Sequence, residues 1–309
     1  MKPSGSRHAT ASALSLDILA PIGFVLLWSS SFIAARAGLR DLSPLTFVAL
    51  RQTACGLFLL ALLLTRPRSL APLAGRWQHC AIAGALINGV FTMAAHWGMV
   101  RVGAALMALT QTLHPLLTAA LAVPLLGEWL RLRQWLGLLL GAAGVALVVG
   151  IAAANSRAQV TGLAVGTAGV LALTAGTLYY GRFCRRVPVL QATMAQFLGA
   201  GLVSIAAVAL FETPRTHWTE TAIAAMAWNA AAVSLGGMAL YLFMLKRGTA
   251  AATTANFYLV PGVTAVMAWL LLGEHLSPLA VAGLALASFG CWLVSASGGS
   301  TRKRDSTTV

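Results

Sequence analysis

Long stretches with almost no charged residues recur along this chain of 309 residues. Each stretch is close to the ~20 residues that an α-helix needs to cross ~30 Å of hydrocarbon. Charged residues and prolines separate the stretches, as at Arg66–Arg68 and Lys246–Arg247. The pattern predicts an all-α integral membrane protein with ten transmembrane helices, over residues 18–37, 44–64, 78–98, 103–126, 134–153, 161–181, 190–210, 222–245, 249–272 and 278–297.

The composition excludes a water-soluble domain of this length. Only 9% of the residues are charged and 59% are hydrophobic, whereas soluble domains carry about a quarter charged residues. The net charge of +14 does not indicate nucleic-acid binding, because Lys and Arg stand singly or in small groups between apolar stretches. The expected partners are therefore a lipid bilayer and a small-molecule substrate, and no nucleic acid.

The distribution of Lys and Arg predicts how the chain is oriented. Fifteen of them fall on the side shared with the N-terminus, and five fall on the opposite side, namely Arg36, Arg40, Arg101, Arg157 and Arg215. Cytoplasmic loops carry the excess of positive charge, so both termini are expected in the cytoplasm and the chain in the cell inner (plasma) membrane. The first apolar run is longer than the core of a cleaved signal peptide, so we interpret it as a retained helix.

The chain repeats itself at an offset of 146 residues. Residues 101–145 and 247–291 share 17 identities in 45 positions, whereas chance in so Ala- and Leu-rich a chain gives roughly a tenth. Because five helices per half is an odd number, the two halves are expected to enter the membrane in opposite directions, an arrangement that recurs in transporters. The predicted organisation is a cytoplasmic tail (1–17), a first repeat (18–153), a second repeat (161–297) and a basic cytoplasmic tail (298–309).

Three stretches carry a family resemblance. They are LLWSSSFIAARAGLRDLSPLTFVALRQTACG, LGEWLRLRQWLGLLLGAAGVALVV and, in the second half, LLLGEHLSPLAVAGLALASFGCWLVS. With two LGE motifs at matched positions, the chain resembles EamA-type members of the drug/metabolite transporter superfamily. The resemblance implies a ten-helix bundle around a central cavity, and export or exchange of small organic metabolites such as amino acids. The second half departs from the first at Thr174, Thr177 and Tyr179–Tyr180.

Polar residues inside the predicted helices fall on common helix faces. Two sets show this spacing: Asn88, Thr92 and His96, and Gln111, His114 and Thr118. Polar groups in hydrocarbon need a partner or a water-filled cavity. We predict a midplane substrate site lined by Trp28, Ser31, Asn88, Thr92, His96, Gln111, His114, Thr177, Tyr180, Asn256 and Tyr258. The alternative is hydrogen bonding between helices, worth about 0.6–2 kcal/mol per bond, and for a single Ser or Thr it is the commoner case.

Two prolines and one arginine lie inside the predicted helices at unusual positions. Pro115 and Pro261 occupy matching places in the two halves and are predicted hinges, with a simple kink as the alternative. Arg51 is the only Lys or Arg deep inside an apolar segment, since Arg36 stands next to the end of the first one. It either binds a substrate carboxylate or has a structural role such as snorkelling to the interface.

The sequence offers no sign of catalysis. It contains no nucleotide-binding loop and no metal-ligand spacing such as HExxH, so we expect no cofactor, no metal and no enzymatic activity. The carboxylates stand at segment ends, in loops or in tails, so any proton coupling would fall to His96 or His114. A membrane-embedded enzyme or assembly factor is the alternative function, and a channel is disfavoured. Small residues along segments 134–153 and 278–297 predict scaffold helices or a homodimer contact.

Overall fold

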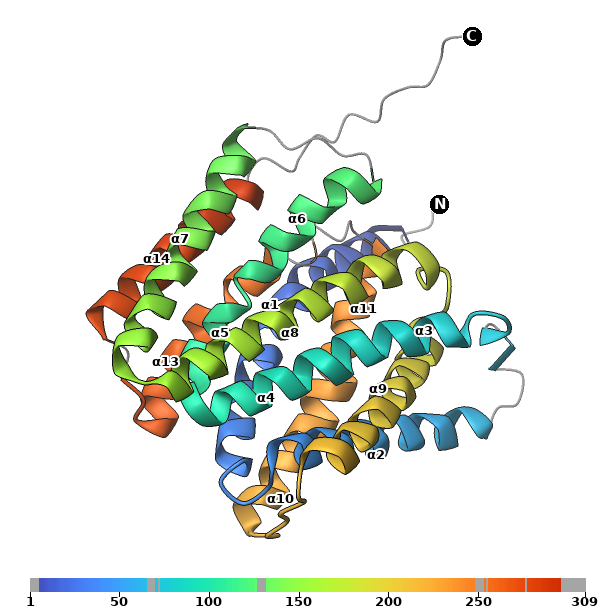
Figure 1. The fold of residues 1–309 in the computed structure, drawn as a ribbon. Helices are drawn as coiled ribbons and strands as arrows, with labels where there is room; N and C mark the ends of the chain where they lie inside the picture. Colours follow the sequence, from blue (N-terminus) through green and yellow to red (C-terminus); the bar gives the residue numbers. More distant parts are fainter. Residues whose placement is uncertain are drawn as a thin grey trace.

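The computed structural model describes residues 6–65, 70–71, 73–126, 132–247, 253, 255–275 and 277–295, and nearly all of them are helical (Figure 1). The helices of the first half are α1 (Ser6–Gly38), α2 (Pro44–Leu64), α3 (Trp77–Gly84), η2 (Ala85–Val90), α4 (Phe91–Val102), α5 (Ala104–Thr110), α6 (Leu113–Leu126) and α7 (Leu132–Asn155). Those of the second half are α8 (Arg157–Phe183), α9 (Val189–Phe211), α10 (Glu220–Ala227), η3 (Trp228–Gly237), α11 (Met238–Arg247), η4 (Ala255–Tyr258), α13 (Val260–Leu272) and α14 (Pro278–Ser295).

Every predicted apolar segment coincides with one or more of these helices. Within the described residues, six continuous apolar helices are long enough to cross a membrane: Leu19–Gly38, Pro44–Leu64, Trp77–Val102, Arg157–Phe183, Val189–Phe211 and Glu220–Arg247. The other four segments contain α5 with α6, α7, η4 with α13, and α14. The all-α membrane fold is thereby confirmed, while the number of ten crossings stays a prediction.

Two of the long helices widen into π-helix at matching positions of the repeat. The segment η2 joins α3 to α4, and η3 joins α10 to α11. At the offset of 146 residues, 85–90 correspond to 231–236, which lie inside η3. Wide turns of this type are uncommon and are frequent at functional sites.

A second pair of irregularities also matches between the halves. Helix α5 ends at Thr110, two turn residues follow, and α6 begins at Leu113. In the second half the 3-10 helix η4 ends at Tyr258 and α13 begins at Val260. The fourth and ninth predicted segments are therefore each broken, at corresponding points, into two shorter helices.

Helices from the two halves pack in pairs that respect the repeat. Helix α2 packs on its counterpart α9, and α7 packs on its counterpart α14. Helix α1 contacts η3 and α13, while its counterpart α8 contacts η2 and α6. The two-repeat architecture therefore extends from the sequence to the packing of the helices.

Close approach between α7 and α14 depends on glycine. A Cβ at Gly144 would lie 2.6 Å from the backbone oxygen of Gly283, and one at Gly290 would lie 2.5 Å from that of Gly137. These two helices lie together at one edge of the molecule (Figure 1). The small residues thus serve a contact within the chain, as expected of scaffold helices, and a homodimer stays a prediction.

Candidate functional site

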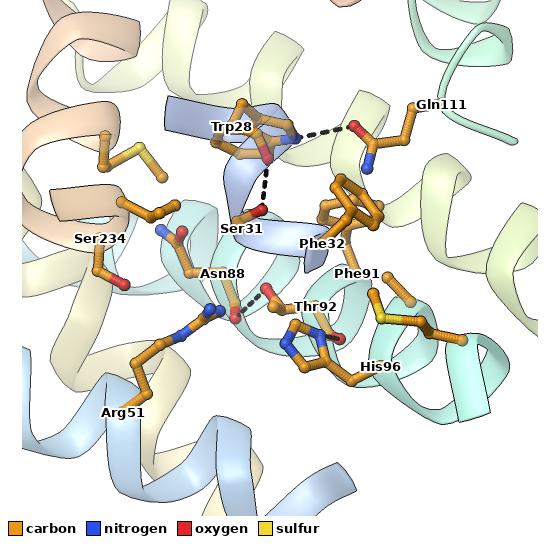
Figure 2. Close-up of a pocket in the computed structure, with 14 residues that line it drawn as sticks. Trp28, Ser31, Phe32, Arg51, Asn88, Phe91, Thr92, His96, Gln111 and Ser234 are labelled. Carbon is orange, nitrogen blue, oxygen red and sulfur yellow. Dashed lines mark hydrogen bonds between the residues drawn. The ribbon is translucent and has the colours of Figure 1, made fainter. Parts of the chain in front are cut away.

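A narrow cavity lies between the halves (Figure 2). Its lining comes from α1, α2, the α3–η2–α4 helix, the turn after α5, and the α10–η3–α11 helix. The lining residues are Trp28, Ser31, Phe32, Arg51, Asn88, Phe91, Thr92, Ala95, His96, Met99, Gln111, Val233, Ser234 and Met238. The space inside holds only about three water molecules, so a larger molecule would require the walls to separate.

Trp28 and Gln111 form one wall of this cavity. The Trp28 Nε1–H donates to Gln111 Oε1 over 2.9 Å, and both side chains are buried. Gln111 belongs to the turn between α5 and α6, so the bond joins α1 to the break in the fourth segment. An indole nitrogen only donates, which fixes the amide orientation and leaves Gln111 Nε2 as a buried donor without a partner among the described residues.

Asn88, Thr92 and His96 follow one another along the opposite wall, as their spacing predicts. Thr92 Oγ1 donates to Asn88 O over 2.6 Å, and His96 Nδ1 lies 2.8 Å from Thr92 O. A carbonyl oxygen only accepts, so Nδ1 carries the proton in this bond. His96 Nε2, which is buried and unpartnered among the described residues, is then an acceptor when the ring is neutral.

Arg51 enters the cavity from α2. Its side chain is buried, with 4% of its surface exposed, so it does not snorkel to the end of the helix. Nη1 donates to Asn229 Oδ1 over 2.8 Å, and Cζ lies 5.9 Å from the centre of the Phe47 ring. Asn229 itself is fully buried in η3 and donates to Ala225 O. The Arg51–Asn229 bond therefore joins the two halves beside the cavity.

Six of the predicted substrate residues, together with Arg51, are thus brought around one cavity. They are Trp28, Ser31, Asn88, Thr92, His96 and Gln111. The lining residues that were not predicted are Phe32, Phe91, Ala95, Met99, Val233, Ser234 and Met238. Apolar lining residues carry no polar signal in the sequence, but the repeat could have identified two of them, because Ser234 and Met238 are the counterparts of Asn88 and Thr92.

Four of the remaining predicted residues, His114, Thr177, Tyr180 and Asn256, lie outside the cavity lining. His114 Nδ1 is 3.0 Å from Thr174 Oγ1, and Thr177 Oγ1 is 2.8 Å from the Tyr241 hydroxyl, so both make contacts between helices. Tyr180 is fully buried, and the Asn256 amide donates to Thr253 O over 3.0 Å. The side chain of Tyr258 lies outside the described residues.

An aromatic cluster packs around Trp28, which also lines the cavity. Phe24, Trp28, Tyr241 and Phe257 have ring centres 5.1 to 6.2 Å apart. Phe257 is the repeat counterpart of Gln111. The two halves have therefore diverged at this position, with a cavity-lining amide in the first half and a packed ring in the second.

The predicted hinge prolines lie in first helical turns. Pro115 is the third residue of α6, and Pro261 is the second residue of α13. A proline in a first turn removes no hydrogen bond from the helix and is well tolerated there. Both prolines therefore follow a break in their segment instead of kinking a continuous helix, and their role as hinges stays a prediction.

At one end of the bundle, Glu274 connects the two halves. Its carboxylate accepts from Arg36 Nε over 3.2 Å and from the backbone N–H of Ala104 over 3.0 Å, with Ala105 N–H at 3.5 Å. Arg36 lies in the last turn of α1, Ala104 begins α5, and Glu274 follows α13. We call these four residues the latch.

A membrane-spanning helical bundle of two related halves, with a polar and aromatic cavity between them, defines a class of protein: the multi-pass membrane transporters. The EamA-like transporter family model matches residues 15–150 and 160–296, and the chain belongs to this family. It is an inner-membrane transporter of the drug/metabolite transporter superfamily.

Relatives of the chain carry transporter names. The "Uncharacterized inner membrane transporter YedA" of Escherichia coli strain K12 is 26% identical, over 87% of each chain. The "Probable terminal-alkyne amino-acid exporter" of Streptantibioticus cattleyicolor is 28% identical, over 91% of this chain and 94% of its own length. A solved crystal structure of another protein, 22% identical, superposes with a TM-score of 0.67 over 90% of this chain and 96% of that one, which supports the fold.

Proposed function

We propose that this protein is a secondary transporter that exports or exchanges a small organic metabolite such as an amino acid. In this proposal the two halves are inverted five-helix repeats that rock about the cavity, so that the cavity opens to one side of the membrane at a time. The halves would move as units about the broken fourth and ninth segments. Both termini face the cytoplasm in this proposal, so the latch lies on the side of the membrane opposite the cytoplasm.

Two features together carry the proposal. The halves enclose a cavity, and the latch joins the same halves at one end of the bundle. The cavity is lined from both halves and is too narrow for a metabolite in this conformation. Arg36 and Glu274, which close one end, are only partly buried, at 33% and 24% side-chain exposure. A partly hydrated ion pair is weak, worth about 0–1 kcal/mol, and is therefore suited to repeated breaking and forming.

The name of one relative supports the cargo class. The Streptantibioticus cattleyicolor protein is called an amino-acid exporter, although a probable one. Buried amide, imidazole and guanidinium groups beside aromatic rings suit a molecule with both polar and apolar parts. Both observations favour an amphipathic organic molecule over an inorganic ion.

The experiment that tests transport is counterflow in liposomes. Purified protein is reconstituted into vesicles preloaded with one unlabelled compound, and uptake of the labelled compound is followed for a panel of amino acids, nucleosides and amphipathic drugs. We expect transient accumulation of at least one compound. If every compound fails with folded protein, transport of a small organic metabolite is wrong, and a membrane enzyme or assembly factor takes its place.

Alternating access has a sharper test at the latch. Arg36→Cys and Glu274→Cys are combined and joined by a short bifunctional thiol reagent. Joining the latch should stop counterflow, whereas each single variant treated with the same reagent should keep it. Counterflow that continues at the uncrosslinked rate would contradict opening at this end of the bundle.

A further inference from the structure

Arg51 is a buried positive charge with no counter-charge among the described residues. Within that part of the chain, the one ion pair is between Arg36 and Glu274 in the latch. Asn229, which accepts from Arg51, is a neutral amide. Holding an unpaired guanidinium away from water is unfavourable, so its position calls for a reason.

The guanidinium of Arg51 retains unused donors. Among the described residues it reaches only one acceptor, through Nη1, and its buried Nε has no partner. In Figure 2 it points toward the side chains of Asn88 and Thr92, across the cavity from Trp28. Arginine carries five N–H groups in a planar fork that matches the two oxygens of a carboxylate.

The second half of the repeat has no cation at the corresponding position. At the offset of 146 residues, Arg51 on α2 corresponds to Phe197 on α9. These two helices are counterparts that pack on each other, and Phe197 is fully buried. The same place in the second half is therefore filled by an apolar ring, which indicates that packing alone does not explain the arginine.

The cavity that Arg51 enters has apolar surface as well as neutral polar groups such as Asn88 and Thr92. Phe32, Phe91, Met99 and Met238 contribute hydrocarbon, aromatic and thioether surface to its lining. Such surfaces favour a ligand with an apolar body, and the single cation favours a ligand with an anionic group at one end.

We propose that Arg51 binds the carboxylate of the transported molecule, an assignment that rests on the proposed transport function. The substrate class is then organic monocarboxylates with an apolar or aromatic body, neutral amino acids included. Arg51 forms a two-oxygen contact with the carboxylate, and Asn229 holds the guanidinium in place. The apolar side chains receive the remainder of the molecule.

The test compares carboxylates with their primary amides. The probes are L-leucine, L-phenylalanine and 3-phenylpropanoate, each paired with its amide, and binding to detergent-solubilised full-length protein is measured by thermal shift and by competition against the tightest ligand. In the unaltered protein we expect carboxylates to bind at least about tenfold more tightly than their amides, which is the size of one lost charge-assisted contact.

Three variants separate recognition from structure. Arg51→Gln retains a donor for Asn229 but loses the charge, and it should abolish the preference for carboxylates while leaving weak amide binding unchanged. Asn229→Ala removes the contact that holds the guanidinium but leaves the charge, so the preference for carboxylates should become smaller without being abolished. Arg157→Gln, at an exposed position on α8, is the matched loss of one positive charge and should behave as the unaltered protein.

The outcomes distinguish the assignment from the proposed function. If Arg51→Gln weakens carboxylates and amides equally, or if the unaltered protein binds both equally, the carboxylate role of Arg51 is wrong while transport stands. If only compounds without a carboxylate bind, the substrate class is wrong and transport stands. If counterflow fails for every compound of the wider panel, the transport function and the assignment fail together.

Discussion

At the residue scale, the bond between Trp28 and Gln111 does two things. It stabilises the turn between α5 and α6, and it orients the Gln111 amide so that a donor faces the cavity. Gln111→Met has similar volume but offers no acceptor to the buried indole N–H. We expect a loss of about 1 kcal/mol in stability, together with a higher KM for transport.

Thermal unfolding in detergent and counterflow kinetics measure these two effects. Gln159→Met is the control, because Gln159 lies on α8 outside the cavity lining. If Gln111→Met shifts stability but leaves KM unchanged, the amide is a structural group only.

A substitution at the contact between His114 and Thr174 is expected to change stability but not the KM for transport. Both side chains are fully buried and lie outside the cavity lining. Thr174→Val should lower the free energy of unfolding by about 0.6–2 kcal/mol and leave the substrate KM unchanged. Thr161→Val on the same helix, at an exposed position, is the matched control for stability. A raised KM without a loss of stability would place Thr174 in contact with substrate.

Helical spacing in the sequence correctly predicted a shared helix face for one set of polar residues but not for another. Asn88, Thr92 and His96 share one face because the helix continues through them, even across η2. Gln111 and His114 were expected on one stripe, but the turn at residues 111–112 separates them. Hydropathy does not reveal such a turn, since in a membrane both sides of the break remain apolar.

At the element scale, the pair of helices α7 and α14 depends on close backbone contact. Gly290→Ala would force a Cβ against the backbone of Gly137, which cannot rotate away as a side chain can. Overpacking of this kind costs about 1–3 kcal/mol, so we expect a lower unfolding temperature in detergent.

Gly262→Ala is the matched control on α13, because no atom lies within 4 Å of the added Cβ. Equal effects of the two substitutions on the unfolding temperature would mean that α7 and α14 are not tightly packed.

The latch is a contact between elements whose strength can be tested without crosslinking. Glu274→Gln removes the ion pair with Arg36 and weakens the bonds to the start of α5. A loss of about 1 kcal/mol raises the open population roughly fivefold. Leu106→Cys, in the hollow beside the latch, should then react faster with a membrane-impermeant thiol reagent.

Glu220→Gln, at an exposed position at the start of α10, is the control and should leave that reaction rate unchanged. Equal reaction rates in the Glu274→Gln variant and its parent would mean that the latch does not hold this end closed.

Apolar segments predicted the helices well, because burial in lipid imposes length and hydropathy directly on the sequence. The widened turns of η2 and η3 were not predicted. A π-turn changes the hydrogen-bond partner of each residue without changing which residue types are tolerated, so composition gives no sign of it. The N-terminal helix also extends to Ser6, within the predicted tail of residues 1–17.

At the scale of the whole molecule, orientation is the prediction with the clearest test. The excess of Lys and Arg places the exposed loop at His217 outside the cell and Arg186 inside. His217→Cys should therefore be labelled by a membrane-impermeant thiol reagent in intact cells, and Arg186→Cys only after permeabilisation. The reverse pattern would invert the topology and would turn the latch toward the cytoplasm.

The matched π-helical turns also bear on the ancestry of the protein. The two halves now differ at most positions of the cavity, as Asn88 and Ser234 do, yet both retain the widened turn at equivalent residues. Independent origin of the same irregularity in two places would be a coincidence. We therefore infer that the widened turn is older than the duplication that produced the two repeats.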